Sequence, residues 1–577
     1  MILGDDCLNN FKSRRSLRTL CSEVLVLLAS AFVLAMAFPG FMTDDGIAPL
    51  VFIALIPVFM VIKNTTWKCV WFHGFIFGLV YYFFFNYWLK GFHSLAIVIA
   101  PVIKGGEMCL LFLALKAVDE AFPKKGYIFK GAVWAAYAFL AENWFAGYPY
   151  GNIVYALYPY RVLYQIADIT GIWGIIYLLV FPEALVADYL YSWICKENPK
   201  FKEWFKSNLI PFIVWAILVV ASVIYGIFAL DYWTDREPIS TVKIAAVQHN
   251  HDSWKGGYKT YRSNFNNLKR YTTESLSTDP DLIIWSETAF VPSVAWHTTY
   301  DAEGTVWEDI HDLTIDFVDY AESIGVPLLT GNPKSVIADP SLPPYDEEGN
   351  KNSKEYNTVI LFQDGEIKGE YIKQHLVPFT EHFPYEKQLP WLYNLLKAMD
   401  YNWWIPGTEP TVFELNGVHF STPICYEDSF SVLNAEYVAS GAEVIINMTN
   451  DNWSKKASAE WQHAEIAAFR SVETRKSMIR GTNSGITCLV VPTGEIQDPM
   501  EPFTMGTHTY TVPVYSQEDY DNTFYVNHID LFARIAIYVS EAVLVFWFIK
   551  KLFFLYKSFK DRKERFSLHL WSTSLSL

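Results

Sequence analysis

The chain has 577 residues, which is enough for two or three domains with large cores. It is 52% hydrophobic and only 18% charged, so it is too apolar for an ordinary soluble enzyme of this size. The net charge of −16 argues against nucleic acid as a partner, because phosphate binding needs a basic face. Its seven cysteines show no CxxC or Cys/His ligand spacing, so no zinc site is predicted.

Hydrophobic runs dominate the first 230 residues and return near the end of the chain. Several approach the roughly 20 residues that a helix needs to cross a bilayer, and shorter runs can tilt or thin the membrane locally. Further runs follow the first one, so we do not interpret it as a cleaved signal peptide. We predict eight transmembrane helices, near residues 22–38, 47–62, 70–88, 95–117, 130–145, 163–187, 208–230 and 531–556.

Lysine and arginine residues predict the orientation of these helices. They gather before the first run, after every second run and after the last, whereas the alternate loops hold little beyond Lys90 and Arg161. Basic residues in short loops mark the cytoplasmic side, so both termini are expected there. The predicted units are a cytoplasmic N-terminus (1–20), a membrane domain with seven helices (21–230), an extracytoplasmic domain (231–529), the eighth helix (530–556) and a cytoplasmic basic tail (557–577).

The long polar region between the seventh and eighth runs alternates β-type runs with helical stretches. This alternation predicts one α/β domain with a covered sheet, and residues 339–354 are expected to form a surface loop. The predicted strands are 242–247, 282–285, 327–330, 358–362, 444–448 and 487–491. The predicted helices are 258–276, 309–324 and 457–478.

Cys425 lies in STPICYEDSF (residues 421–430), where a hydrophobic approach runs into the cysteine and acidic residues follow. The pattern predicts a buried strand, a sharp turn that exposes the thiol, and a helix directly after it. The positive end of that helix would favour the thiolate. A single cysteine beside a strand is more often a small core residue, so the neighbouring motifs must decide between the two interpretations.

Two further stretches place ionisable groups at the ends of apolar runs. Glu287 follows a strand-like run and Trp285, where partial desolvation can make it a base. Lys373 lies among aromatic residues and can hold a positive charge where an oxyanion develops. Taken singly, each is more often a solvated surface group. With Cys425 they form a minimal set for acyl transfer through a thioester.

These motifs carry a family resemblance. In this order, WSET (285–288), YIKQHLVPFTEHFP (371–384) and STPICYED (421–428) resemble the Glu–Lys–Cys signature of the nitrilase, or carbon-nitrogen hydrolase, superfamily. The HLVPF run and the eight spans around the domain resemble the family of bacterial apolipoprotein N-acyltransferases. The resemblance implies an integral membrane α-helical bundle plus an extracytoplasmic α/β nitrilase-like α-β-β-α sandwich, in the bacterial inner membrane with the catalytic domain on the periplasmic side.

The same resemblance implies a ping-pong reaction. An acyl chain passes from a phospholipid, expected to be phosphatidylethanolamine, to the cysteine. From this thioester it passes to the α-amine of the diacylglyceryl-modified N-terminal cysteine of an apolipoprotein. The resemblance implies a monomer, and no cofactor or metal is called for.

Roles for single residues follow from the resemblance position by position. Glu287 matches the general base, Lys373 the oxyanion-stabilising lysine and Cys425 the nucleophile. The supporting positions are Glu381, which helps to position the lysine, Tyr426 and Glu427 around the nucleophile, Trp254 at the entrance, and Asn450 and Trp453 in a loop beside the site. RGTNSG (480–485) is expected to support the turn at the cysteine.

The sequence departs from the family pattern at three places and leaves some alternatives open. Ser286 stands where proline is usual, Thr380 where glycine often occurs, and SKK rather than Phe-Gly follows Trp453, which bears on how lipid reaches the site. Lys104 and Glu107 form either an intramembrane pair or, if their helix starts later, a group at the interface. Cys488 is expected to be buried in a strand.

Two other functions were weighed against acyl transfer. A membrane-tethered amidase or nitrilase would use the same three residues but would need only one anchoring helix. A transporter or receptor with a ligand-binding outer domain would leave the Glu–Lys–Cys set unexplained and predicts broken helices at mid-membrane.

Overall fold

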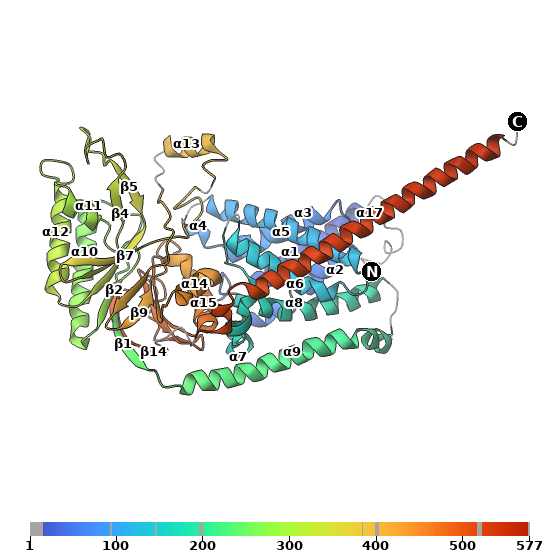
Figure 1. Ribbon diagram of the computed structural model, residues 1–577, viewed down its shortest axis with the longest axis horizontal. Coiled ribbons are helices and arrows are strands. Elements are labelled where there is room, and N and C mark those ends of the chain that lie inside the picture. The colour runs from blue at the N-terminus through green and yellow to red at the C-terminus, as the bar shows by residue number, and fades with distance from the viewer. Residues whose placement is uncertain are drawn as a thin grey trace.

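The computed structural model describes residues 16–92, 95–144, 147–195, 200–383, 385–398, 403–515 and 522–574. The expected cytoplasmic segment 1–20 and the end of the basic tail lie partly outside these residues. A bundle of helices occupies one end of the molecule, and an α/β domain occupies the other (Figure 1). We refer to them as the helical domain and the α/β domain.

The helical domain contains the apolar runs of the sequence. Its helices are α1 (Leu17–Ala35), η1 (Ala48–Phe52), α2 (Ile56–Asn64), α3 (Val70–Phe85), α4 (Leu89–Phe92), α5 (Ala96–Ala121), α6 (Tyr127–Asn143), η2 (Ile153–Leu157), α7 (Arg161–Tyr164), α8 (Ala167–Ile194), α9 (Phe201–Asp235) and α17 (Leu531–Ser574). α9 runs along one side of the bundle, and α17 crosses the bundle and extends beyond it (Figure 1).

Small residues bring α3 and α5 close together. A Cβ atom added at Gly74 would lie 2.6 Å from the carbonyl oxygen of Met108, and one at Gly78 would lie 2.7 Å from the Met108 side chain. Such approaches are possible only without a side chain, and small residues are the usual means of tight helix packing in membranes.

Five helices, α1, α5, α8, α9 and α17, are long and apolar enough to cross a membrane. The predicted spans at 47–62, 70–88 and 130–145 correspond to shorter helical segments: η1 with α2, α3, and α6, which ends at Asn143. The chain is therefore a multi-pass membrane protein with several apolar helices, and the full count of eight spans stays a prediction.

Two six-stranded sheets form the core of the α/β domain. Their strand orders are β14-β1-β2-β3-β6-β7 and β13-β12-β11-β10-β9-β8. β1, β2 and β3 run parallel, as do β9, β10 and β11, while the outer strands pair antiparallel. The strands of these sheets are β1 (Ser240–Gln248), β2 (Leu282–Trp285), β3 (Leu328–Gly331), β6 (Thr358–Gln363), β7 (Glu366–Ile372), β8 (Val412–Leu415), β9 (Val418–Ser421), β10 (Val444–Thr449), β11 (Ser477–Thr482), β12 (Cys488–Val490), β13 (Ile496–Gln497) and β14 (Gly506–Val514). β4 (Lys334–Ile337) and β5 (Ser353–Tyr356) form a separate antiparallel pair.

Helices cover the outer faces of the two sheets. The helices of the α/β domain are α10 (Tyr258–Ser275), η3 (Leu276–Thr278), α11 (Val294–Thr299), α12 (Glu308–Ser323), α13 (Pro390–Ala398), η4 (Cys425–Ser429), α14 (Ser431–Ala439), α15 (Ala457–Thr474) and α16 (Phe524–Asn527), and α13 stands away from the sheets (Figure 1). α10 and α12 lie on one side of the domain, and α14 and α15 lie at the helical domain (Figure 1). The layers have the order of an α-β-β-α sandwich.

Alternation along the strands assigns side chains to the two sides of each sheet. In β1, Ile244 and Ala246 join the core between the sheets, whereas Ala245 and Val247 pack with α10 and α12. Successive side chains of a strand point to opposite faces, so a strand buried on both faces has a continuous apolar run. A Cβ atom at Gly481 of β11 would lie 2.7 Å from Ile284 of β2, so the two sheets are in direct contact there.

One predicted helix is shorter than expected. The stretch 457–478 forms a helix only as far as Thr474, and its end belongs to β11. Arg475 adopts a left-handed conformation with φ of 55° and ends the helix. Glycine is the usual residue at such a position, so the sequence carries no local signal for this end.

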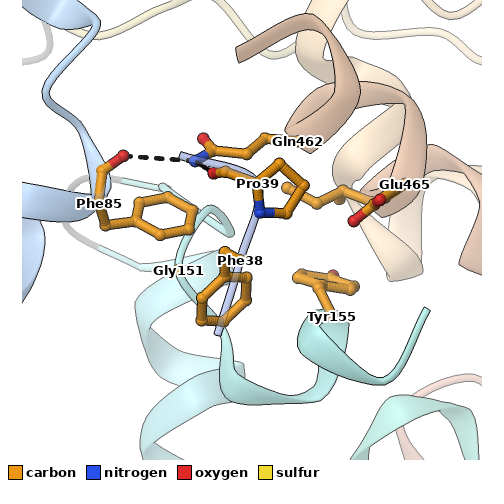
Figure 2. Close-up of a pocket in the computed structure, with 8 residues that line it drawn as sticks. Phe38, Pro39, Phe85, Gly151, Tyr155, Gln462 and Glu465 are labelled. Carbon is orange, nitrogen blue, oxygen red and sulfur yellow. Dashed lines mark hydrogen bonds between the residues drawn. The ribbon is translucent and has the colours of Figure 1, made fainter. Parts of the chain in front are cut away.

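The two domains meet over α15, which is buried along nearly its whole length. Gln462 of α15 donates to the carbonyl oxygen of Pro39 and accepts from the Trp88 indole at 2.8 Å. Arg475 forms an ion pair of 2.7 Å with Asp168 of α8. Figure 2 shows a small pocket at this junction, lined by Phe38, Pro39, Phe85, Gly151, Tyr155, Gln462, Glu465 and Ile466.

Candidate active site

Cys425 stands at the turn between β9 and α14. Its φ of 55° places it in the left-handed region, which costs a residue with a side chain about 1–3 kcal/mol and is characteristic of functional sites. The side-chain amide of Asn447 holds this turn by donating to the Cys425 carbonyl oxygen at 2.9 Å. The predicted sharp turn is present. The predicted exposure is wrong: Cys425 is only 6% exposed, and a short 3-10 turn separates it from α14.

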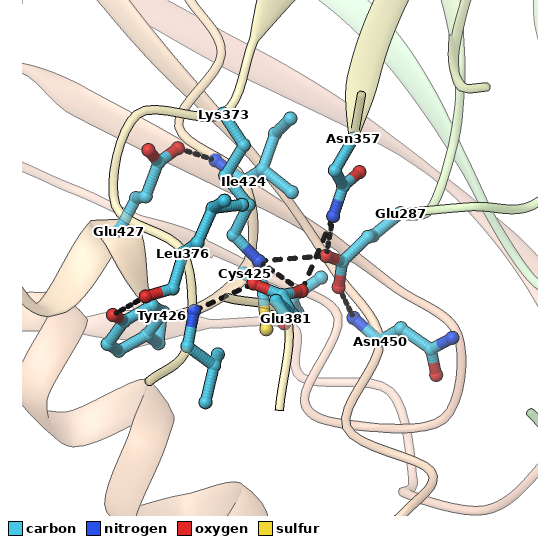
Figure 3. A network of polar contacts seen from close by, with 12 residues as sticks. Glu287, Asn357, Lys373, Leu376, Glu381, Ile424, Cys425, Tyr426, Glu427 and Asn450 are labelled. Carbon is cyan, nitrogen blue, oxygen red and sulfur yellow. Dashed lines mark hydrogen bonds and ion pairs between the residues drawn. The ribbon is translucent and has the colours of Figure 1, made fainter. Parts of the chain in front are cut away.

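Lys373 joins the two predicted glutamates. Its Nζ atom lies 3.0 Å from Oε1 of Glu287 and 2.9 Å from Oε1 of Glu381. Figure 3 shows the ammonium group between these carboxylates, with Cys425 beside them. The Lys373 side chain is completely buried, so its charge is compensated by the two glutamates rather than by solvent.

Glu287 follows β2 and is fixed by groups from two other segments. The Asn357 amide donates to its Oε1 at 2.8 Å, and the backbone N–H of Asn450 donates to its Oε2 at 3.2 Å. A Cβ atom at Gly331 would lie 2.3 Å from the backbone nitrogen of Thr288, so glycine lets the neighbouring strand approach this turn. The carboxylate is thus held in one orientation, as a positioned base requires.

Burial and nearby carboxylates oppose ionisation of the Cys425 thiol. Burial, followed by the carboxylate of Glu287, raises the pKa of the Cys425 thiol well above its usual range, although Lys373 acts in the opposite direction. Burial opposes the charge on Lys373, but Glu287 and Glu381 outweigh it and hold the pKa of its ammonium group well above the usual range. The expectation that the following helix favours the thiolate is therefore not met, and a nucleophilic attack needs a base.

Glu427 connects the turn at Cys425 with the segment that carries Lys373. Its carboxylate accepts hydrogen bonds from the Tyr371 hydroxyl at 2.9 Å and from the backbone N–H groups of Gln374 at 2.8 Å and Ile424 at 2.7 Å. The Tyr426 hydroxyl donates to the Leu376 carbonyl oxygen at 2.9 Å. Glu427 and Tyr426 hold the site in place, because removing the Glu427 carboxylate or the Tyr426 hydroxyl would leave buried polar groups unpaired.

The remaining predicted residues lie at the edge of this cluster. Asn450 accepts hydrogen bonds from Ser253 and Asn483, each at 2.9 Å. Trp254 is 56% exposed, and its ring lies 5.4 Å from that of Phe92 in α4. The Trp453 ring lies 5.7 Å from the same phenylalanine. Trp254 and Trp453 of the α/β domain therefore both contact Phe92 in α4 of the helical domain.

Residue-by-residue interpretation of the sequence missed a buried polar network behind Cys425. His463 of α15 lies 2.8 Å from Asp428 through Nε2 and 3.0 Å from Asp451 through Nδ1. Arg480 also pairs with Asp428. The network ties the turn at Cys425 to the loop of Asn450. Asp428 and Arg480 belong to motifs singled out from the sequence, whereas His463 does not.

Two open points of the sequence analysis are resolved. Cys425 and Cys488 are both free, and Cys488 is buried in β12. Lys104 lies well inside α5, which begins at Ala96, so the alternative of a later helix start is wrong. Its Nζ atom is 2.5 Å from Glu107 and lies over the Tyr82 ring.

Because of the buried His375, we expect the folded protein to lose stability in mild acid. Burial lowers the pKa of His375 from 6.5 to about 4, and its Nδ1 has no hydrogen-bond partner among the described residues. Between these two pH values the unfolded chain takes up a proton that the folded chain refuses, so the folded state loses stability as pH falls. At about 1.4 kcal/mol for each pH unit, the loss is at most about 3.5 kcal/mol.

His375→Phe should therefore lose less stability than the wild type between pH 6.5 and 4. Phenylalanine retains the packing against Phe430, whose ring lies 4.4 Å from that of His375. The measurement is the apparent melting temperature in detergent against pH. Parallel curves for the two proteins would contradict the assignment.

Comparisons with known proteins cover both domains. The family model described as carbon-nitrogen hydrolase matches residues 243–520, and the model described as apolipoprotein N-acyltransferase N-terminal domain matches residues 30–185. Apolipoprotein N-acyltransferase 1 of Treponema denticola is 33% identical over 83% of this chain and 88% of its own length. The protein of the same name from Treponema pallidum is 33% identical over 86% of this chain and 91% of its own length.

Among solved structures, an amidase of Nesterenkonia from the nitrilase superfamily is 18% identical, with a TM-score of 0.33 over 50% of this chain and 94% of that one. The α/β domain has the carbon-nitrogen hydrolase fold. The Treponema relatives match along both the α/β domain and the helical domain, which a singly anchored amidase would not have. The chain belongs to the apolipoprotein N-acyltransferase family.

Proposed function

We propose that the protein transfers an acyl chain from a membrane phospholipid to the α-amine of a diacylglyceryl-modified cysteine at the N-terminus of an apolipoprotein. The observation that carries this proposal is the buried Lys373, held between Glu287 and Glu381 beside Cys425, in a chain related to acyltransferases over both domains. Acting on lipoproteins and membrane phospholipids fits the membrane character of the helical domain.

In the first half-reaction Glu287 takes the proton of the Cys425 thiol, and the sulfur attacks the ester carbonyl of the phospholipid. The ammonium group of Lys373 stabilises the oxyanion, and Glu381 holds that ammonium group in place. The intermediate collapses to a thioester, and the glycerol oxygen leaves with the proton from Glu287. We propose phosphatidylethanolamine, cleaved at sn-1, as the donor.

In the second half-reaction the amine of the lipoprotein attacks the thioester. Glu287 accepts a proton from the amine, an amide bond forms, and the sulfur leaves and regains a proton as the thiol. Glu427 and Tyr426 keep the turn at Cys425 in place during both steps. Trp254, Asn450 and Trp453 border the route of the substrates to the site.

The proposed topology has eight transmembrane helices, both termini in the cytoplasm and the α/β domain in the periplasm, with the domain limits given above. The distribution of basic loop residues supports it. So does the arrangement of the first and last helices: the chain reaches the α/β domain at Pro39 just after α1, and α17 starts at that domain and runs away from it (Figure 1). We propose that the enzyme acts as a monomer in the inner membrane.

Intact-mass analysis of the protein after incubation with phosphatidylethanolamine tests the proposal. We expect a gain of one fatty acyl chain that hydroxylamine removes, and no gain in Cys425→Ala. Adding a diacylglyceryl-modified peptide should discharge the adduct and yield the N-acylated peptide. Failure of the active, membrane-reconstituted protein to form an adduct, together with turnover of small amides, would favour an amidase instead.

A further inference from the structure

A buried carboxylate of the helical domain reaches the segment that follows Cys425. Glu142 lies in the last turn of α6 and is only 1% exposed. Its Oε1 atom accepts a hydrogen bond of 2.7 Å from the backbone N–H of Ser431, the first residue of α14. α14 has no side-chain cap of its own, because Phe430 stands at the N-cap. Glu142 therefore supplies the missing cap from the other domain.

The start of α14 is held from a second side by α15. The Ser431 hydroxyl donates to Glu473 at 2.9 Å, and the Arg470 guanidinium donates to the Ser429 carbonyl oxygen at 2.7 Å. Arg470 and Glu473 also pair with each other at 2.8 Å. The segment of residues 429–431 is thus fixed between one element of the α/β domain and one residue of the helical domain.

Contacts lead from the start of α14 back to the nucleophile. The side-chain amide of Asn434, one turn into α14, donates to the carbonyl oxygen of Glu427 at 2.8 Å. Glu427 in turn accepts the N–H of Ile424. Cys425 lies between these two residues in its left-handed conformation, which persists only if the surroundings enforce it. A displacement of α14 would therefore move the thiol.

We propose that Glu142 is a positioning residue for Cys425, so that the helical domain forms part of the support of the active site as well as the membrane anchor. The inference rests on the proposed role of Cys425 as nucleophile. Displacement of a reacting group by about 1 Å can slow a reaction by about 100-fold. Loss of the Glu142 contact should thus reduce the rate of the chemical step and leave phospholipid binding unchanged.

The chain offers a matched control for this contact. Glu183 of α8 is also 1% exposed, and its Oε2 accepts a hydrogen bond of 2.7 Å from the backbone N–H of Leu55 at the start of α2. It caps a helix as Glu142 does, but the helix it caps does not carry Cys425. A change at Glu183 therefore reports the cost of losing a buried cap alone.

The experiment compares Glu142→Met, Glu142→Gln and Glu183→Met in the full-length, reconstituted protein. Methionine is similar in volume but cannot accept the hydrogen bond, whereas glutamine can. The single-turnover rate of acyl-enzyme formation is measured against phosphatidylethanolamine concentration, beside the melting temperature. Glu142→Met should lower the saturating rate by about 10- to 100-fold without changing the half-saturating lipid concentration. Glu142→Gln should restore the rate, and Glu183→Met should lower only the melting temperature.

The inference is overturned if Glu142→Met forms the acyl-enzyme at the wild-type rate. It is also overturned if Glu183→Met loses rate in proportion to its loss of stability, because the loss of a buried cap alone would then slow acylation. If Glu142→Met does not fold, Ser431→Pro replaces it, because proline is tolerated at the first helical position and lacks the N–H that Glu142 accepts. Ser431→Ala, which retains that N–H, is its control, and equal rates in the two variants overturn the inference. Absence of an acyl-enzyme in the wild type itself would refute the proposed function instead.

Discussion

Lys373→Met should abolish acyl-enzyme formation and also destabilise the α/β domain. The substitution removes the cation between Glu287 and Glu381 and leaves both carboxylates buried without it. Breaking a buried ion pair by removing one partner costs about 3–5 kcal/mol. Losing one group that stabilises the oxyanion costs a further factor of about 100–1000 in rate. No other single change removes the charge compensation and the oxyanion partner together.

The double variant Lys373→Met/Glu381→Gln separates the two effects. Neutralising Glu381 removes one of the uncompensated charges, so the melting temperature should recover in part while acylation stays absent. Intact-mass kinetics and thermal unfolding on the same samples provide both measurements. If Lys373→Met alone forms the acyl-enzyme within about tenfold of the wild-type rate, Lys373 has no role in the chemistry.

Glu287→Gln should change two reactions of Cys425 in opposite directions. Burial raises the pKa of the Cys425 thiol most strongly, and the Glu287 carboxylate raises it further. Removing the charge of Glu287 therefore lowers that pKa. The thiolate should then form at lower pH, and alkylation by iodoacetamide should begin at lower pH than in the wild type. Acylation by phospholipid needs a base to move the proton and should fall by about 100- to 10,000-fold.

Alkylation of Glu287→Gln and of the wild type is followed by mass spectrometry between pH 6 and about 10, a range that covers ordinary cysteine ionisation. Asn357→Ala serves as a control, because it removes a hydrogen-bond donor to Glu287 but leaves the charge. Its alkylation profile should stay close to that of the wild type. A Glu287→Gln profile shifted to higher pH would contradict the electrostatic role assigned to Glu287.

The sequence predicted the groups that end apolar runs, and the structure places three of them together. Glu287, Lys373 and Cys425 were predicted as a set, and Glu381 was added by the family resemblance. In the structure the side chains of Glu287, Lys373 and Glu381 form one buried cluster. The burial of Cys425 was not predictable in the same way. The left-handed turn at a residue that is not glycine, and the short 3-10 segment after it, depend on contacts such as that of Asn447 from a neighbouring strand.

The supporting residues that were missed share a physical reason. His463 and Glu142 act on groups that are distant in the sequence, Asp428 for the former and Ser431 for the latter. Periodicity and local motifs report the burial of such residues but not their partners. The same reason applies to β11, whose start follows a left-handed Arg475 without glycine. By contrast, β1, β2, β3, β6 and β10 were predicted from their apolar runs, whereas β11, a central strand of the second sheet, was not.

The close packing of α3 on α5 restricts the paths by which a lipid tail can travel. Where Gly74 and Gly78 face Met108, even a single added carbon atom would overlap the neighbouring helix. A hydrocarbon chain is wider than that, so the two helices act as one closed wall along this stretch. In the proposed reaction a phospholipid therefore cannot enter between α3 and α5 along this stretch and must approach the sulfur by another route.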